Sequence, residues 1–268
     1  MENKSKFNYV LMLLGLCLGT AAMIPEFSIS IFDFSATVCK LGAIVLIVMS
    51  LVKQNSEWQN NKPTAFIVLS IVTAVMAFIS IITTLVGVIS WIGTIAGIIS
   101  IVMARKAYNA EWNNAATAPI VTIACATVVA FYEVINDDAV LMNIAAIVAY
   151  VLIIMNAPKT GIEALGKLKI AAILGIVTSV LYMIKIAGIV AWIPYLVFVV
   201  FVLLAFMNYK KAVPAANLLF IGSIVLVVEE IFDFIPGVDF FVCPVLALAT
   251  IALSIVGWVK VITEMEKA

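Results

Sequence analysis

Six charged residues lie within or beside long apolar stretches of the sequence, where ionisable side chains are costly. They are two lysines and four acids: Lys40, Glu133, Lys185, Glu229, Glu230 and Asp233. Charged groups at such positions usually form ion pairs, reach toward water or line a path for ions. We expect Lys40 and Lys185 to reach outward or to pair with the acids. A role in ion or solute passage is the alternative.

Other chemistry has little support in the sequence. There is no histidine, and the four cysteines form no CxxC pair. The sets of residues that most often bind zinc and haem are therefore absent from the sequence. The sequence also has no Gly-rich phosphate loop and no serine-histidine arrangement. We therefore expect a protein that is not an enzyme, with no catalytic residue, metal site or cofactor. Burial as small apolar thiols is the simplest role for the cysteines.

The apolar stretches themselves predict an integral membrane protein. Of the 268 residues, 65% are hydrophobic and 11% are charged, and the mean hydropathy is +1.24. Soluble domains are about half apolar and a quarter charged. Within lipid the backbone must satisfy its own hydrogen bonds, as it does in helices or closed barrels. Continuous apolar runs such as 43–52 and 195–207 favour an all-α fold, because barrel strands alternate between apolar and polar residues.

Ten apolar segments are each near the ~20 residues that a membrane-spanning helix needs. They cover 7–24, 34–52, 64–83, 86–104, 118–135, 139–156, 168–187, 190–209, 214–233 and 238–260. Taken in pairs they predict five tandem helical hairpins, at 7–53, 64–106, 118–159, 168–211 and 214–260. Because no long polar stretch separates them, we expect one polytopic membrane domain and no soluble domain.

The hairpins also resemble one another in sequence. Met49, Met103, Met155 and Met207 each precede a basic helix end, at intervals of 54, 52 and 52 residues. The linkers 57–61 and 111–114 both begin with Glu-Trp. A fixed period of roughly 50 residues is typical of a repeated supersecondary unit, although regular topology alone would also place a cation after every second helix.

Ten short helices with short loops resemble the drug/metabolite-transporter superfamily in outline. That superfamily duplicates a five-helix unit, whereas the period here is two helices. The resemblance therefore implies no site residues in this chain.

The cations predict the orientation of the ten helices. On a ten-helix path, 13 of the 15 Lys and Arg residues fall on one side, and only Lys40 and Lys185 do not. The positive-inside rule makes the basic side cytoplasmic, which places both termini in the cytoplasm. Short loops and this bias suit a bacterial cytoplasmic membrane.

Two pairs of glycines are candidates for close helix packing. Gly15 and Gly19 form one GxxxG pattern, and Gly93 and Gly97 form another. Small residues let helix backbones approach each other within lipid. We expect these faces to pack inside the protein, with packing against a partner chain as the alternative.

These features together favour a non-catalytic accessory or scaffold subunit of a membrane complex. Its partners would be the lipid bilayer and other membrane-protein subunits. The alternative is a small-solute or ion transporter or channel, which the number of helices and the six charged residues favour. A net charge of zero gives no electrostatic support for binding to nucleic acid.

Overall fold

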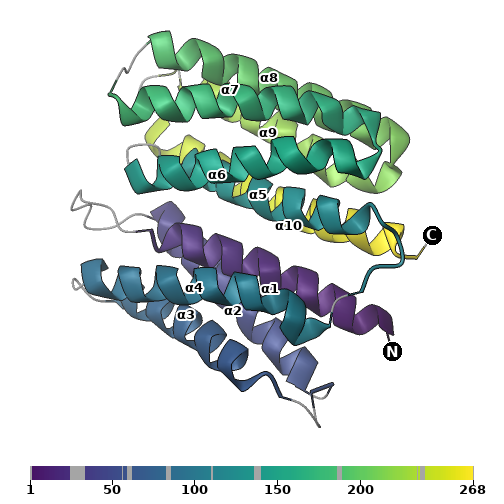
Figure 1. The fold of residues 1–268 in the computed structure, drawn as a ribbon. Coiled ribbons are helices and arrows are strands. Elements are labelled where there is room, and N and C mark those ends of the chain that lie inside the picture. Colours follow the sequence, from purple (N-terminus) through teal and green to yellow (C-terminus); the bar gives the residue numbers. More distant parts are fainter. Residues whose placement is uncertain are drawn as a thin grey trace. The chain divides into compact units, whose positions relative to one another are not determined.

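The computed structural model describes residues 2–24, 34–55, 57–58, 62–82, 86–109, 111–135, 140–185, 189–233, 235 and 239–267. These residues form helices and no strand (Figure 1). The α-helices are α1 (Glu2–Ala22), α2 (Phe34–Asn55), α3 (Thr64–Ile82), α4 (Val86–Tyr108), α5 (Thr117–Glu133), α6 (Val140–Asn156), α7 (Gly166–Met183), α8 (Ile189–Ala212), α9 (Asn217–Asp233) and α10 (Asp239–Met265). Three short 3-10 helices are η1 (Ala157–Thr160), η2 (Glu163–Leu165) and η3 (Pro214–Ala216).

The prediction of an all-α, multi-pass membrane protein is confirmed. Within the described residues, 8 helices are long and apolar enough to cross a membrane. The other two apolar helices, Lys6–Ala22 and Thr117–Glu133, are shorter. The 17 residues of α5 rise about 26 Å, against a hydrocarbon core of about 30 Å. That α1 and α5 also cross the membrane stays a prediction.

The observed helix ends differ from the predicted ends by a few residues. Four helices continue past the basic residues at which we ended them, to Asn55, Tyr108, Ala212 and Met265. Basic side chains suit the last turn of a helix, because they face the negative end of its dipole and can extend toward water. In contrast, α7 ends early, at Met183, and Lys185 follows it with a left-handed φ of 57°.

The chain divides into two compact units, Met1–Trp112 and Asn113–Ala268, called unit 1 and unit 2 below. The division falls between the second and third predicted hairpins. In both units the two helices of each predicted hairpin pack against each other.

In unit 1, α1 packs against α2, α3 and α4, and the glycines of both GxxxG patterns lie at these contacts. A Cβ on Gly15 or Gly19 would meet side chains of α2. A Cβ on Gly93 or Gly97 would meet Met23 or Thr20 from the α1 side, and α3 as well. Both glycine faces are therefore filled within the unit.

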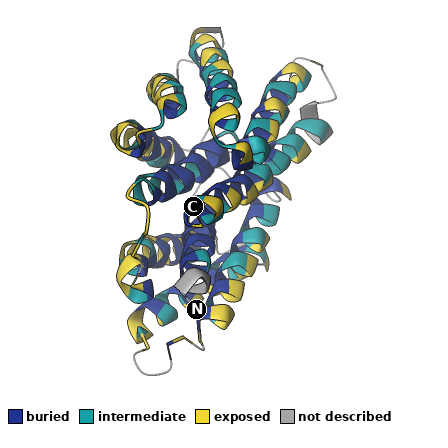
Figure 2. Ribbon diagram, turned by 90° about the vertical axis from the view of Figure 1, so that its right-hand side faces the viewer, coloured by how far each residue is buried: buried dark blue, intermediate teal, exposed yellow. Residues whose placement is uncertain are grey.

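In several helices, small or hydroxyl-bearing residues are frequent on the buried face and large apolar residues are frequent on the exposed face. Figure 2 shows where the buried and exposed faces lie on the ribbon. In α3 the buried face is mostly small and includes Ser70, Thr73 and Ala77. The opposite face exposes Val68, Ile71, Val75, Phe78 and Ile82. This pattern is the reverse of that in a soluble helix, and it suits a helix whose outer face meets lipid.

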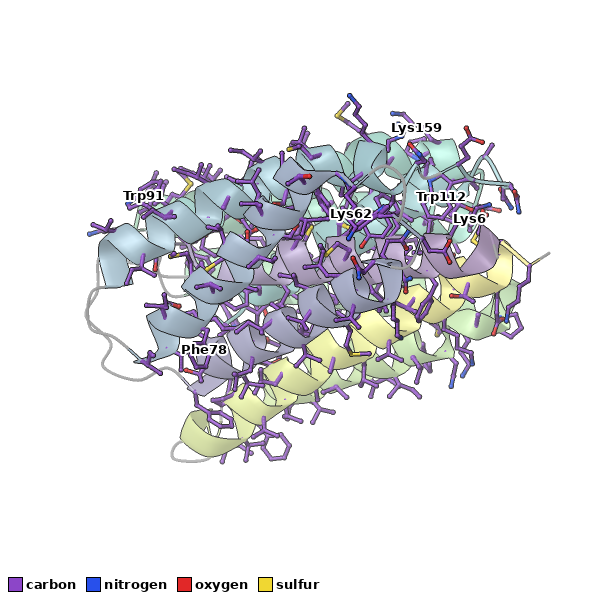
Figure 3. All side chains as sticks on the ribbon, turned by 90° about the horizontal axis from the view of Figure 1, so that it is seen from below. Lys6, Lys62, Phe78, Trp91, Trp112 and Lys159 are labelled. Atoms are coloured by element: carbon purple, nitrogen blue, oxygen red, sulfur yellow. The ribbon has the colours of Figure 1, made fainter. Side chains whose placement is uncertain are left out.

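The two ends of unit 1 differ in chemistry. Figure 3 shows Lys6 and Trp112 toward one end, and Trp91 and Phe78 toward the other. At the basic end, Trp58 donates an indole hydrogen bond to the Ala107 carbonyl, 3.0 Å away, and its ring packs against Phe66 and Tyr108. Tyr9 lies between Tyr108 and Trp112. The tryptophans of the two similar linkers therefore belong to one aromatic cluster.

Unit 2 is a closed ring of six helices, which we call the helix ring. Each helix from α5 to α10 packs against the next, and α10 packs against α5. Glu266 strengthens this closure at the basic end of the unit. Its carboxylate accepts hydrogen bonds from the backbone of Asn113 and Asn114, in the segment before α5, and from the hydroxyl of Thr117, and so connects the end of α10 to the chain that leads into α5.

Candidate functional site

A cluster of buried carboxyl and hydroxyl groups lies inside the helix ring, toward the end opposite Lys159, Lys210 and Lys260. We call it the carboxylate cluster and define it as Glu133, Tyr150, Ser179, Tyr195, Glu229 and Glu230. These residues come from five consecutive helices, α5 to α9. On the sixth helix, α10, the Cys243 thiol lies 3.7 Å from the Glu229 carbonyl oxygen. All six helices of the ring therefore meet at this level.

Glu133, the last residue of α5, is the centre of one half of the cluster. The Tyr150 hydroxyl donates to its Oε2 over 2.9 Å, and the Ser179 hydroxyl donates to its Oε1. Ser179 belongs to α7, which is not a neighbour of α5 in the helix ring. The Glu133 side chain therefore points into the interior, and it is 6% exposed.

Glu230 forms the second half, and Phe198 connects the two. The Tyr195 hydroxyl donates to Glu230 Oε1 over 2.8 Å. The Phe198 ring stacks on the ring of Tyr195 at a centroid distance of 5.9 Å, and it meets the ring of Tyr150 edge-on at 5.7 Å. Both tyrosines thus lie against one buried aromatic side chain.

Glu229 differs from the other two acids in its hydrogen bonding. Its side chain is 6% exposed, yet its buried Oε2 has no hydrogen-bond partner among the described residues. A buried carboxyl oxygen without a donor is costly, so such a group calls for a ligand, a proton or water. Together with Glu133 and Glu230, it makes the interior a concentrated source of negative charge or of exchangeable protons.

Local sequence explains how Tyr150 reaches Glu133. Gly175 of α7 faces the Tyr150 ring, and a Cβ at this position would overlap that ring. The absent side chain lets the ring lie flat against the α7 backbone. From there the hydroxyl extends to the end of α5.

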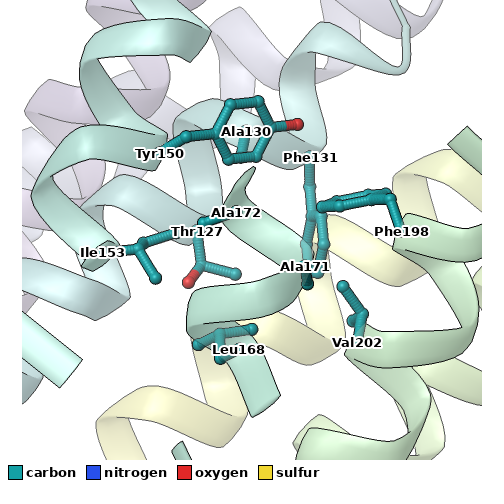
Figure 4. A pocket seen from close by; sticks show the side chains of 10 residues that line it. All are labelled: Thr127, Ala130, Phe131, Tyr150, Ile153, Leu168, Ala171, Ala172, Phe198 and Val202. Carbon is teal, nitrogen blue, oxygen red and sulfur yellow. The ribbon is translucent and has the colours of Figure 1, made fainter. Parts of the chain in front are cut away.

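Below the carboxylate cluster the helix ring holds a small cavity of about 10 Å³. Figure 4 shows Tyr150, Phe131, Phe198, Val202 and Leu168 around it. This volume is about enough for one water molecule. The interior is therefore almost filled beneath the acids.

The other predicted site residues lie outside the carboxylate cluster. Asp233 ends α9, one turn beyond Glu229, and is exposed, as is Lys185 in the turn after α7. Lys40 is half-buried in α2 of unit 1. The structure thus places three of the six residues in the carboxylate cluster, and the proposed pairing of the two lysines with acids stays a prediction. Among the described residues, no three acids or cysteines converge as a metal site would require.

No protein-family model, curated protein or solved structure matches this chain. The function must therefore be inferred from the site itself.

No sequence pattern indicated Tyr150, Ser179 and Tyr195, the hydroxyl donors of the cluster. Each lies in an apolar helix, where a hydroxyl group needs a partner. That requirement was the available signal. It does not say which partner is used, because a serine can also bond the carbonyl one turn earlier, as the short distance of 2.9 Å from Ser179 to Gly175 illustrates.

Proposed function

We propose that the protein transports a small cation across the membrane, and that the carboxylate cluster is its binding site. One observation carries the proposal: Glu133, Glu229 and Glu230 are buried together inside a closed ring of apolar helices. Ionisable residues within a membrane are expensive, so they usually mark a pathway for ions or protons.

The arrangement of the donors supports a site that changes its charge. Three hydroxyl groups hold Glu133 and Glu230 in place, and these can donate to a carboxylate or reorient toward a carboxyl group. Glu229 keeps one buried oxygen without a donor. Glu229 and Glu230 are adjacent in α9, and two acids in a low-dielectric interior repel one another when charged, which favours uptake of a positive charge.

The scaffold subunit that the sequence favours gains less support from the structure than the transporter does. The case for a scaffold rested in part on the two glycine faces, and in unit 1 these faces are filled by side chains of α1, α2 and α3. Native mass spectrometry of the protein in nanodiscs separates the two functions. A stoichiometric complex with other subunits would favour the scaffold, whereas a protein that is isolated alone would favour the transporter.

The direct test is ion flux in liposomes that contain the purified protein. We expect wild-type protein to move sodium, potassium or protons along an imposed gradient. Glu229→Gln should reduce this flux by about tenfold or more, since it removes a charge on which the barrier depends. The matched control is Glu163→Gln, because Glu163 is exposed at the basic end of the same unit. Wild-type flux equal to that of empty liposomes would overturn the proposal.

The orientation forms part of the same proposal. We place the basic ends of the helices in the cytoplasm, in the cytoplasmic membrane of a bacterial cell, and the carboxylate cluster toward the opposite side.

A further inference from the structure

Three buried side chains on one face of α10 have polar atoms without hydrogen-bond partners. They are Thr250 Oγ1, Ser254 Oγ and Trp258 Nε1, on side chains that are 1%, 2% and 0% exposed. Elsewhere in unit 2, hydroxyl groups usually bond the carbonyl oxygen four residues earlier, as Thr127, Thr178 and Thr263 do. Buried polar atoms that lack a protein partner usually bind ordered water.

This face of α10 points into the helix ring. The Trp258 ring meets the rings of Phe206 and Tyr209 at centroid distances of 5.9 and 6.1 Å, and both of these residues belong to α8, two helices away in the ring. Thr250 and Ser254 precede Trp258 by two turns and one turn, so they share its face. The hydroxyl of fully buried Tyr209 also has no partner.

The unpaired atoms of α10 lie between the carboxylate cluster and the basic end of the unit. The first of them, on Thr250, is seven residues or about 10 Å beyond Cys243, a distance that a chain of about three water molecules spans. Cys243 marks the level of Glu229, and Trp258 is 15 residues further along α10, a rise of about 22 Å. Thr250, Ser254 and Trp258 are each separated by four residues, or about 6 Å. One bridging water reaches across such a gap, because each of its hydrogen bonds spans roughly 2.8 Å.

We propose that the transported cation is a proton, and that it passes between the carboxylate cluster and the basic end along a water chain on this face of α10. This inference rests on the proposed function and names its substrate and route. A proton on the Glu229 carboxyl would leave its Oε2 for a water molecule. It would then move along hydrogen bonds past Thr250 and Ser254 to the hydroxyl of Tyr209, while a second proton reloads Glu229. No bond other than O–H bonds breaks or forms.

A chain of hydrogen bonds is a route that a proton can use and that a hydrated metal ion cannot. Thr250 and Ser254 are 1% and 2% exposed, so their hydroxyl groups are closed off from bulk water. A route past them admits single water molecules and not a hydrated ion. The cluster donors are hydroxyl groups, which can both give and accept a proton.

The test is proton flux into liposomes that carry a pH-sensitive dye, with a potassium gradient and valinomycin to set the membrane potential. We expect wild-type protein to acidify or alkalinise the interior according to the sign of the potential. The double variant Thr250→Val with Ser254→Ala should lower this flux by about tenfold or more, because the water chain loses two of its hydrogen-bond partners.

Two control variants separate the route from general damage. Thr263→Val makes the same chemical change on α10, but at a hydroxyl that bonds the Val259 carbonyl. Thr250→Ser keeps the hydroxyl group at the route. Both should retain proton flux within about twofold of wild type, since neither removes a group from the chain. Thermal unfolding in detergent checks that the double variant is folded. If the double variant does not fold, Thr250→Val and Ser254→Ala are each tested as single variants.

The outcomes separate this inference from the proposed function. Proton flux that the double variant retains would overturn the route. Sodium or potassium flux without any proton flux would overturn the choice of ion and leave the proposed function standing. Absence of flux for all three ions would overturn both.

Discussion

Two buried carboxyl groups of the carboxylate cluster are held by hydroxyl groups from other helices. Glu133 accepts from Tyr150 and Ser179, and Glu230 accepts from Tyr195. Hydrogen bonds between membrane helices stabilise a fold by about 0.6–2 kcal/mol each. The tyrosines therefore both support the fold and place the acids.

At the residue scale, Tyr150→Phe removes one of the two donors to Glu133. We expect it to lower the free energy of unfolding by about 1 kcal/mol and to reduce ion flux. Tyr209→Phe is the stability control, because the Tyr209 hydroxyl is buried without a partner and its loss should be neutral or stabilising. Thermal unfolding of the two variants in the same detergent compares them. Equal stability of both would contradict the role assigned to Tyr150.

Gly175→Ala tests the close approach of the Tyr150 ring to α7. The added methyl group would overlap the ring, so we expect a loss of stability of about 1–3 kcal/mol together with a fall in flux. Gly166→Ala is the matched change on the same helix, where a Cβ meets nothing within 4 Å. That variant should be as stable as wild type or more stable, since alanine favours helix. Unfolding midpoints that fall equally would argue against a specific contact at Gly175.

Among the elements, the contact between the end of α10 and the start of α5 closes the helix ring. A carboxylate near the start of a helix interacts favourably with the positive end of the helix dipole, and here it also accepts from the backbone N–H groups of Asn113 and Asn114, which precede α5. Glu266 provides this carboxylate although it is about 150 residues away from α5 in sequence, as its bond to Thr117 shows.

Glu266→Ala removes this long-range contact. We expect it to lower the free energy of unfolding by about 1–3 kcal/mol and to make the backbone amides of Asn113 and Asn114 exchange faster with deuterium, because they lose their acceptor. Glu264→Ala is the control, because Glu264 is exposed only two residues earlier. Hydrogen exchange by mass spectrometry reports on the segment that leads into α5 directly. Unchanged exchange there would mean that the contact with Glu266 is energetically unimportant.

For the whole molecule, the separation of basic and acidic helix ends predicts its orientation. A green fluorescent protein fused after Ala268 should fluoresce, because it folds in the cytoplasm, while alkaline phosphatase at the same position should stay inactive. The same two reporters fused after Lys185, in the turn that follows α7, should give the opposite result: alkaline phosphatase should be active and the fluorescent protein should be dark. Phosphatase activity at the C-terminus would reverse the orientation of the carboxylate cluster in the membrane.

The sequence by itself determined the class of fold and nearly every helix. Apolar segments near 20 residues long can only be helices in lipid, because the backbone must satisfy its hydrogen bonds there. The helix boundaries were predicted to within a few residues, since charges and prolines interrupt the apolar runs. The same reasoning identified Glu133, Glu229 and Glu230, because a charge beside an apolar segment stands out.

Only the tertiary structure decided which side chains meet. Helix α8 is apolar around most of its circumference, so its sequence does not show that Tyr195, Phe198 and Tyr209 share the inner face. Closure of the helix ring depends on contacts between α5 and α10, which are far apart in the chain. In lipid both faces of a helix can be apolar, and the rotation of each helix about its axis is set by packing and hydrogen bonds that no local pattern records.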